Sequence, residues 1–307
     1  MVAMPKVAKT IKISTHHEQW LEANNINFSA WIREKIDAEM GQLNKRPDDK
    51  QCKAVILAAG KDTDLFPLTE DRPKAMLDIK GRSILEWQVE LLSQVGINEI
   101  AVVRGYQKQM INLPALLYFD NEDYENTGSL VSLFAAREFI DCTTIVLYGD
   151  ILFEISILQR LIEEKDTTTL VVDRGWKKRY LDSREGHPLP PELATLQERD
   201  REIEISSLTV GMQENNSNSE FIGLAKLSPS TGAILKDFYE KVYNPDQPEA
   251  NKEAMHIKKA SFIEFIQELL NRGENVTALE IWRNWIEVDT FEDYRNAWIH
   301  INDLMDY

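Results

Sequence analysis

The chain has 307 residues, is 43% apolar and carries a formal net charge of −16 at pH 7. This length is enough for one large α/β domain with a small appendage, and no apolar run is long enough to span a bilayer. Residues 1–40 contain five Lys or Arg and five Asp or Glu, so the acidic excess falls in the rest of the chain. Because phosphate contacts need clustered cations, this main body is unsuited to broad non-specific binding of nucleic acid.

The cysteine content and the N-terminal composition point to one cellular setting. There are only two cysteines, Cys52 and Cys142, and their spacing is not that of a metal site. Polar residues from Lys6 onward interrupt any apolar core of a secretory signal. We therefore expect a reduced, cytoplasmic protein with no membrane association.

Residues 1–44 are expected to form a first unit, with its elements between residues 9 and 40. Ile11 and Ile13 alternate with polar residues, which predicts a short strand. Thr15 can cap a helix, and a second helix is predicted by apolar residues at helical spacing, namely Phe28, Trp31, Ile32, Ile36 and Met40. The run N-F-S-x-W-I-R-E resembles the ribbon-helix-helix fold of small repressors. One such unit cannot bury its own core, so we expect a homodimer formed through residues 9–40.

Two roles stay open for this unit. In ribbon-helix-helix repressors the outward strand residues read the DNA major groove, and here they would be Thr10, Lys12 and Ser14. Alternatively, the unit only joins two copies of the chain, which we favour because it is neutral and tethered to an acidic body. Residues 45–51 are polar and aperiodic, which is typical of a linker, so the second domain is expected at 52–307.

The stretch after the linker organises the main domain. Residues 54–58 are an apolar run with β-branched residues at its centre, which predicts a buried strand. Ala59 and Gly60 present no bulky side chain, so a ligand can come close to the backbone there. Lys74 follows a proline that fixes φ, so a cation is held on a stiff segment. Open α/β sheets bind their ligands at the carboxyl ends of such strands.

Helical and strand patterns alternate along the rest of the chain. We expect helices at 83–92, 129–136, 156–164, 228–243 and 261–270. Strands are expected at 97–103, 116–119, 144–148, 168–172 and 285–290, with a β excursion at 200–219. Alternating β and α units of these lengths indicate a three-layer α/β fold with a mostly parallel sheet.

Two features of these elements carry chemistry. Asp150 comes just after a buried strand, where a carboxylate suits Mg²⁺ and leaves coordination sites for phosphates, although a strand-end Asp can equally cap the next turn. The Thr127-Gly128-Ser129 turn offers backbone N–H groups at a helix start, which suit a base or a phosphate. Alternatively, Ser129 is an ordinary N-cap.

The organising stretch resembles the signature L-A-A-G-x-G-x-R-L-x-P-L-T, then P-K, of nucleotidyltransferases that make CDP-, UDP- or dTDP-activated compounds. The matching residues are Leu57, Ala58, Ala59, Gly60, Leu65, Pro67, Leu68, Thr69, Pro73 and Lys74. Two positions depart from the signature. Asp62 stands where the second Gly is usual, and Asp64 replaces an Arg that normally faces the triphosphate. We therefore expect Lys61 or Arg72 to bind the phosphates in part of the role of the missing Arg.

This resemblance implies a three-layer, Rossmann-like (GT-A-like) nucleotidyltransferase fold with a mixed, mostly parallel sheet. A narrower resemblance begins at residues 121–133, where N-x-x-Y-x-x-T-[NG]-x-x-x-S-L is similar to phosphocholine cytidylyltransferases and their phosphonate relatives. Residues 172–176 and 220–224 look like the cytidylyltransferases often fused to phosphoenolpyruvate mutases, which act in phosphonate biosynthesis. The similarity covers residues 52–300.

The resemblance assigns roles to particular residues. Lys74, Asp150 and Asp289 are expected to be catalytic, and the two aspartates to hold Mg²⁺. Asp289 lies in W-I-E-V-D-T, which resembles the closing motif W-x-E-I-D-T of the same family, although it could also cap the last helix. The expected nucleotide-binding residues are Leu57, Ala58, Ala59, Gly60, Lys61, Arg72, Tyr106, Thr127, Gly128 and Ser129. The expected acceptor-binding residues are Tyr180, Arg184, His187 and Glu220.

The implied reaction is Mg²⁺-dependent transfer of CMP from CTP to a small phosphonate, such as 2-aminoethylphosphonate or 2-hydroxyethylphosphonate, with release of pyrophosphate. One alternative is a phosphocholine or sugar-1-phosphate nucleotidyltransferase. Another is a DNA-binding regulator whose transferase-like domain only senses a nucleotide. The presence of Lys74, Asp150 and Asp289 together argues against the regulator, since a pure sensor needs no such set.

Overall fold

The computed structural model describes residues 52–177, 190–211, 218–243 and 257–305. The expected N-terminal unit and linker lie outside these residues, as do three of the expected acceptor-binding residues, Tyr180, Arg184 and His187. None of the described helices is both long and apolar enough to cross a membrane.

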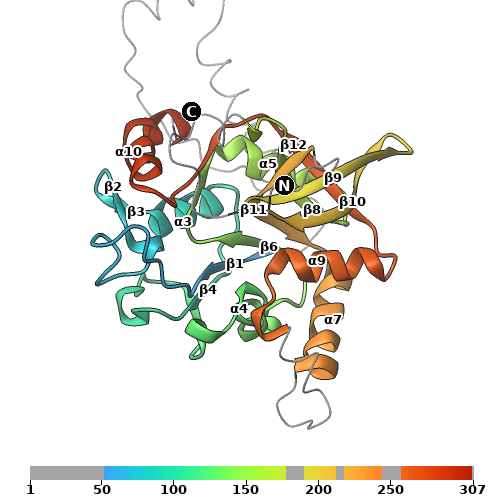
Figure 1. The fold of residues 1–307 in the computed structure, drawn as a ribbon, viewed down its shortest axis with the longest axis horizontal. Helices are drawn as coiled ribbons and strands as arrows, with labels where there is room; N and C mark the ends of the chain where they lie inside the picture. The colour runs from blue at the N-terminus through green and yellow to red at the C-terminus, as the bar shows by residue number, and fades with distance from the viewer. Residues whose placement is uncertain (1–51, 178–189, 212–217, 244–256, 306–307) are drawn as a thin grey trace, which may run out of the picture. The chain divides into compact units, whose positions relative to one another are not determined.

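Among the described residues, nine strands form one mixed sheet in the order β5-β4-β1-β6-β11-β8-β12-β10-β9 (Figure 1). Their bounds are β1 Cys52–Ala58, β4 Ile100–Arg104, β5 Leu117–Asp120, β6 Thr143–Tyr148, β8 Thr168–Asp173, β9 Glu192–Arg199, β10 Glu202–Val210, β11 Ser219–Leu227 and β12 Val276–Ile281. The group β5-β4-β1-β6 is parallel, and so is the pair β8–β12. Strand β11 runs antiparallel between them, and β10 and β9 add an antiparallel edge.

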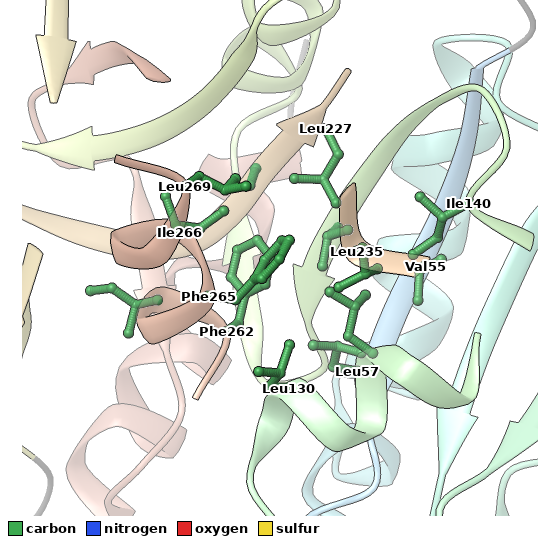
Figure 2. Close-up of a cluster of buried hydrophobic side chains, with 14 of the residues drawn as sticks. Val55, Leu57, Leu130, Ile140, Leu227, Leu235, Phe262, Phe265, Ile266 and Leu269 are labelled. Carbon is green, nitrogen blue, oxygen red and sulfur yellow. The ribbon is translucent and has the colours of Figure 1, made fainter. Parts of the chain in front are cut away.

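Alternating side chains of β1 reach the two outer layers. Val55 and Leu57 belong to one buried cluster, which contains residues of α4 (Ser129–Ala135), α7 (Pro229–Phe238) and α9 (Phe262–Asn271) (Figure 2). Ala54, Ile56 and Ala58 belong to the opposite cluster, with residues of α3 (Ile84–Gln94) and α5 (Ile155–Glu163). Because strand side chains point alternately to opposite faces, these two clusters are the two sides of a three-layer fold.

Short polar sequences set where the helices begin. Ser83 and Glu86 form a capping box at α3, and Ser261 with Glu264 forms a second one at α9. Ser228 caps α7, which continues into a π-helical turn η5 (Tyr239–Tyr243). The remaining short helices are η1 Lys74–Met76, η2 Lys108–Met110, η3 Tyr124–Asn126 and η4 Arg137–Phe139.

A small third cluster lies beside the sheet and brings the two ends of the domain together. It contains residues of the hairpin β2–β3 (Asp78–Ile79, Arg82–Ser83), of β7 (Ile151–Phe153) and of the last helix α10 (Phe291–Met305). Strand β13 (Trp285–Glu287) pairs antiparallel with β7, and Val288 donates its N–H to the Asp150 carbonyl at 3.0 Å. The C-terminal motif therefore lies next to the end of β6.

The helices and most of the strands expected after the linker occur within a few residues of their predicted bounds. The sheet is mixed, as expected, but its antiparallel share is larger than the alternating pattern suggested. Strand β13 begins where the strand at 285–290 was expected, whereas β2, β3, β7, β9, β11 and β12 have no counterpart among the predicted elements. Strands β2, β3 and β7 are only two or three residues long, which is too short for apolar periodicity to identify them.

Candidate active site

A cavity of about 400 Å³ opens at the carboxyl ends of β1 and β6. Such strand ends are where open α/β sheets bind ligands. The cavity is lined by Leu57, Ala58, Ala59, Gly60, Lys61, Asp62, Thr63, Asp64, Lys74, Ala75, Tyr124, Thr127, Gly128, Ser129, Ser132, Tyr148, Gly149, Asp150 and Glu192. Most of the residues that we predicted to bind the nucleotide therefore line this cavity.

Lys74 lies at the centre of the charged side of the cavity. It begins η1 directly after Pro73, and its side chain is only 11% exposed. Its Nζ lies 2.7 Å from Asp289 Oδ1 and 3.1 Å from Asp150 Oδ2, two residues that are 215 and 76 positions away in the chain. Burial alone would lower the pKa of this ammonium, but the three carboxylates around it together raise the pKa well above its ordinary value.

The third carboxylate is that of Asp62, which stands out in the sequence only as a departure from the family signature. Asp62 Oδ2 lies 2.8 Å from Lys74 Nζ. Asp62 Oδ1 accepts the backbone N–H groups of Asp64 and Leu65 at 2.9 and 3.0 Å. The residue thus folds the loop after β1 and joins it to Lys74. Its place in a loop that precedes a P-K pair was the only signal in the sequence.

Asp150, Glu287 and Asp289 form a group that suits a divalent metal. Each residue contributes one carboxylate oxygen, and these three oxygens lie within 4.8 Å of one another. Asp289 is 1% exposed, and Asp150 Oδ1 is buried and accepts no hydrogen bond within the described part of the chain. Hard oxygen donors at this spacing fit Mg²⁺ or a similar ion. Glu287 was not predicted, although it stands in the same closing motif as Asp289.

Electrostatics and capping agree with this assignment. Burial raises the pKa of Asp150, the charge of Asp289 adds to that rise, and Lys74 opposes it. The alternative role of Asp289 as a helix cap is taken by Thr290 and Asp293. The Asp293 carboxylate accepts the Thr290 N–H at 2.9 Å, and Thr290 Oγ1 accepts the Asp293 N–H at 3.1 Å.

The turn at 127–129 lines the cavity, but the Gly128 amide is used differently from what we expected. Gly128 donates its N–H to the Lys258 carbonyl at 2.8 Å, and Ser129 Oγ accepts the Phe262 N–H at 2.8 Å. A Cβ at Gly128 would lie 2.1 Å from the Ala260 carbonyl oxygen. Close packing against residues 258–260 therefore accounts for the glycine, and its N–H group is not free for a phosphate.

The remaining predicted residues separate into two groups. Lys61 lines the cavity, with its Nζ 5.4 Å from the centre of the Tyr106 ring. Tyr106 itself is buried and Arg72 pairs with Asp71 at 2.8 Å, and neither is among the residues that line the cavity. Glu220 is 2% exposed on β11 and likewise does not line it.

Glu192 and Tyr148 form a second polar pair in the cavity that the sequence did not predict. The Tyr148 hydroxyl donates to the Glu192 carboxylate at 3.0 Å to the nearer oxygen. Burial raises the pKa of Glu192 to about 7, with further contributions from other nearby carboxylates, while the bond from Tyr148 opposes the rise. Among the described residues no ion pair of Glu192 is found, and its carboxylate lines the cavity.

Sequence comparison identifies the family. The model of the MobA-like NTP transferase domain matches residues 54–210. The chain is 32% identical to CTP:phosphoglutamine cytidylyltransferase of Campylobacter jejuni over 251 residues, which covers 78% of this chain and 96% of that enzyme. It is also 32% identical to CMP-5'-(3-aminopropyl)phosphonate synthase of Streptomyces rubellomurinus over 136 residues, or 42% of this chain and 22% of that protein.

Solved structures agree on the fold. CTP:phosphocholine cytidylyltransferase from Streptococcus pneumoniae superposes with a TM-score of 0.61 at 20% identity, covering 82% of this chain and 99% of that one. The inositol-1-phosphate CTP transferase from T. maritima gives 0.61 at 18% identity, covering 84% and 98%. These likenesses, with the family match and the arrangement around Lys74, lead to one conclusion: the chain belongs to the MobA-like NTP transferase family and is a nucleotidyltransferase.

Proposed function

We propose that the protein is a Mg²⁺-dependent cytidylyltransferase that transfers CMP from CTP to a small amine-bearing phosphonate, with release of pyrophosphate. The observation that carries this proposal is the convergence of Lys74, Asp150 and Asp289 at the open end of β1 and β6. A cation beside a group of metal-binding carboxylates is the arrangement that phosphoryl-type transfer needs. The named activities of three relatives support CTP as the nucleotide.

The chemistry requires no protein nucleophile. A phosphonate oxygen attacks the α-phosphorus of CTP in line, one P–O bond forms, and the bond to the β-phosphate breaks so that pyrophosphate leaves. Lys74 neutralises charge on the phosphoryl group during transfer. Asp150 and Asp289, with Glu287 beside them, would hold Mg²⁺, which supplies further charge neutralisation when bound. The small residues Ala59 and Gly60 let the nucleotide come close to the backbone.

Glu192 is what favours an amine on the acceptor. Its carboxylate lies in the same cavity as Lys74 and is held by the Tyr148 hydroxyl. A protonated primary amine can donate a hydrogen bond to this carboxylate and also compensate its charge. 2-Aminoethylphosphonate can both donate this hydrogen bond and compensate the charge, whereas 2-hydroxyethylphosphonate can only donate the hydrogen bond. Two of the relatives are named for aminopropylphosphonate and for choline phosphate.

The test is pyrophosphate release with Mg²⁺ and CTP against four acceptors: 2-aminoethylphosphonate, 2-hydroxyethylphosphonate, phosphocholine and glucose 1-phosphate. We expect turnover with both phosphonates and the highest kcat/KM for the amine. Phosphocholine is expected to be weaker, since a quaternary ammonium cannot donate a hydrogen bond to Glu192. Highest activity with glucose 1-phosphate would replace the proposal with a sugar-1-phosphate nucleotidyltransferase, and a lack of activity with all four would contradict it.

The N-terminal segment has a separate proposed role. We propose that residues 1–44 join two copies of the chain, that residues 45–51 are a linker, and that the protein is cytoplasmic. The strand-helix-helix pattern and its apolar spacing support the dimer. Sedimentation of the full chain should give twice the monomer mass, and Ile32→Glu should give the monomer with its nucleotidyltransferase activity kept. A full-length monomer at micromolar concentration would contradict this role.

A further inference from the structure

Asp62 combines two sets of contacts that together suggest a role in the reaction. Its Oδ1 is committed to the backbone N–H groups of Asp64 and Leu65, at 2.9 and 3.0 Å. Its backbone carbonyl accepts the hydroxyl of Thr69, which is fully buried, at 2.9 Å. The side chain is only 12% exposed. Asp62 is thus fixed by its own loop, and its second oxygen faces Lys74 at 2.8 Å.

Lys74 is shared between two kinds of carboxylate. Asp150 Oδ2 and Asp289 Oδ1 accept hydrogen bonds from its Nζ, and these two residues also belong to the group that suits a divalent metal. Asp62 contacts the same Nζ but is not part of that group. A divalent cation on Asp150 and Asp289 would compete with the ammonium for their charge and would also repel it.

We propose that Asp62 is a positioning residue that keeps Lys74 in the cavity when a metal ion takes the carboxylates of Asp150 and Asp289. The ammonium then keeps one fixed counter-ion, Asp62, instead of becoming a buried charge beside a divalent ion. Lys74 can therefore remain at the site of phosphoryl transfer, and the metal gains its ligands more easily. The structural part of this inference is independent of the acceptor, and its catalytic part rests on the proposed function.

The chain offers a matched control in the same loop. Asp64 is an exposed carboxylate that lines the cavity, and no ion pair joins it to Lys74 in the described structure. Asp62→Asn retains the shape and one oxygen acceptor for the loop amides and removes only the charge. Asp64→Asn removes a charge from almost the same place. A difference between the two variants therefore reports the contact with Lys74 rather than the charge of the loop.

The decisive measurement is Mn²⁺ binding to the full chain without nucleotide, followed by electron paramagnetic resonance. We expect Asp62→Asn to weaken Mn²⁺ binding by about 3- to 10-fold and Asp64→Asn by less than about 2-fold, since one charged contact is at stake. Lys74→Met should tighten Mn²⁺ binding, because the competing ammonium is gone. In the Lys74→Met background, Asp62→Asn should have no larger effect than Asp64→Asn.

Two results would overturn the inference. Equal effects of Asp62→Asn and Asp64→Asn would show that the contact with Lys74 does not affect metal binding. A full effect of Asp62→Asn in the Lys74→Met background would show that Asp62 acts on the metal directly. Circular dichroism establishes whether each variant folds, and equal effects of Asp62→Asn and Asp64→Asn overturn the inference even if Lys74→Met does not fold.

Turnover separates this inference from the proposed function. With CTP and 2-aminoethylphosphonate, Asp62→Asn should raise the Mg²⁺ concentration for half-maximal rate and lower kcat by about 10-fold, whereas Asp64→Asn should leave the Mg²⁺ dependence near that of the wild type. No turnover by the wild type would contradict the proposed function while the Mn²⁺ result still decides the role of Asp62. Normal turnover with an unchanged Mg²⁺ dependence in Asp62→Asn would contradict the inference alone.

Discussion

The two charged regions of the cavity differ in how their carboxylates are compensated. Around Lys74, three carboxylates converge on one buried ammonium within 3.1 Å. At Glu192, a single carboxylate is held by the Tyr148 hydroxyl, and no ion pair to it is found among the described residues. The first region is already organised around a cation of the protein itself. The second region carries charge that a ligand can compensate.

Under the proposed function, this difference suits the two regions to different parts of the reaction. A group of carboxylates that suits a metal, next to a buried lysine, fits the phosphates of CTP. Negative charge develops there as the phosphoryl group is transferred and pyrophosphate leaves. A partly buried carboxylate held by a tyrosine suits a cationic end of the acceptor, because removing that charge from water is unfavourable until a cation binds. The following changes test the two regions and the packing of the cavity wall, in order of expected effect.

Asp289→Asn should have the largest effect. It removes a carboxylate that serves both Lys74 and the metal group, so kcat should fall by about 10³-fold or more while the fold is kept. The measurement is pyrophosphate release at saturating CTP and Mg²⁺, with the midpoint of thermal unfolding as the control for folding. A variant that retains more than a tenth of the wild-type kcat would remove Asp289 from the catalytic group.

Glu192→Gln should change acceptor preference rather than the transfer step. We expect kcat/KM for 2-aminoethylphosphonate to fall by about 10- to 100-fold, and that for 2-hydroxyethylphosphonate to change by less than about 3-fold, since only the charged contact is lost. The ratio of the two kcat/KM values is the measurement. An equal loss with both acceptors would mean that Glu192 does not recognise the amine.

The same pair of acceptors gives a pH dependence. Because the pKa of Glu192 is raised to about 7, this carboxyl is protonated below that pH and cannot pair with an amine. The preference for 2-aminoethylphosphonate should therefore increase as pH rises through about 7. Ionisation of Asp150 affects both acceptors alike, but the ammonium of 2-aminoethylphosphonate lowers the pKa of its own phosphonate. Each wild-type ratio is therefore divided by the ratio measured with Glu192→Gln at the same pH. This quotient should rise through about pH 7, and a quotient that stays flat with pH would contradict the assignment.

Gly128→Ala tests whether the turn at 127–129 is built by packing. The added Cβ would meet the Ala260 carbonyl oxygen at 2.1 Å, so we expect a loss of about 2–3 kcal/mol in the free energy of unfolding. Gly60→Ala is the matched control, because nothing lies within 4 Å of a Cβ there. Denaturant unfolding should separate the two variants. Similar stabilities would contradict the packing explanation for Gly128.

Lys61→Ala and Arg72→Ala should give the smallest and most selective effects. Lys61 lines the cavity, whereas Arg72 is paired with Asp71 outside its lining. We expect Lys61→Ala to raise KM for CTP by about 5- to 10-fold and Arg72→Ala by less than about 2-fold. If Arg72→Ala had the larger effect, the side chain would have to enter the cavity when CTP binds.

Local sequence was informative where chemistry coincides with a strand end or a stiff turn. Lys74 follows a proline and Asp150 follows a buried strand, so both could be singled out before the fold was known. Asp62 and Glu192 could not, because their roles come from partners that only the folded chain brings close. Lys74 is twelve residues from Asp62 along a loop without periodicity, and Tyr148 is 44 positions from Glu192.

The sheet shows the same limit. Alternating helices and strands were enough to predict three layers, since each strand of the parallel group is a short apolar run. The antiparallel insertion of β11 between β6 and β8 depends on register between distant strands, which apolar periodicity does not specify. Glu287 shows a further limit, because the motif that contains it was recognised but only Asp289 was given a role.

The most direct test of the central claim is phosphorus NMR of the wild-type protein with Mg²⁺, CTP and 2-aminoethylphosphonate. The account predicts a new product in which a phosphonate resonance is coupled to that of a phosphate ester, formed together with an equal amount of pyrophosphate, and absent with Asp289→Asn. Pyrophosphate without the coupled product would mean hydrolysis rather than transfer. An unchanged spectrum under conditions in which CTP binds would contradict the assignment of this cavity to cytidylyl transfer onto a phosphonate.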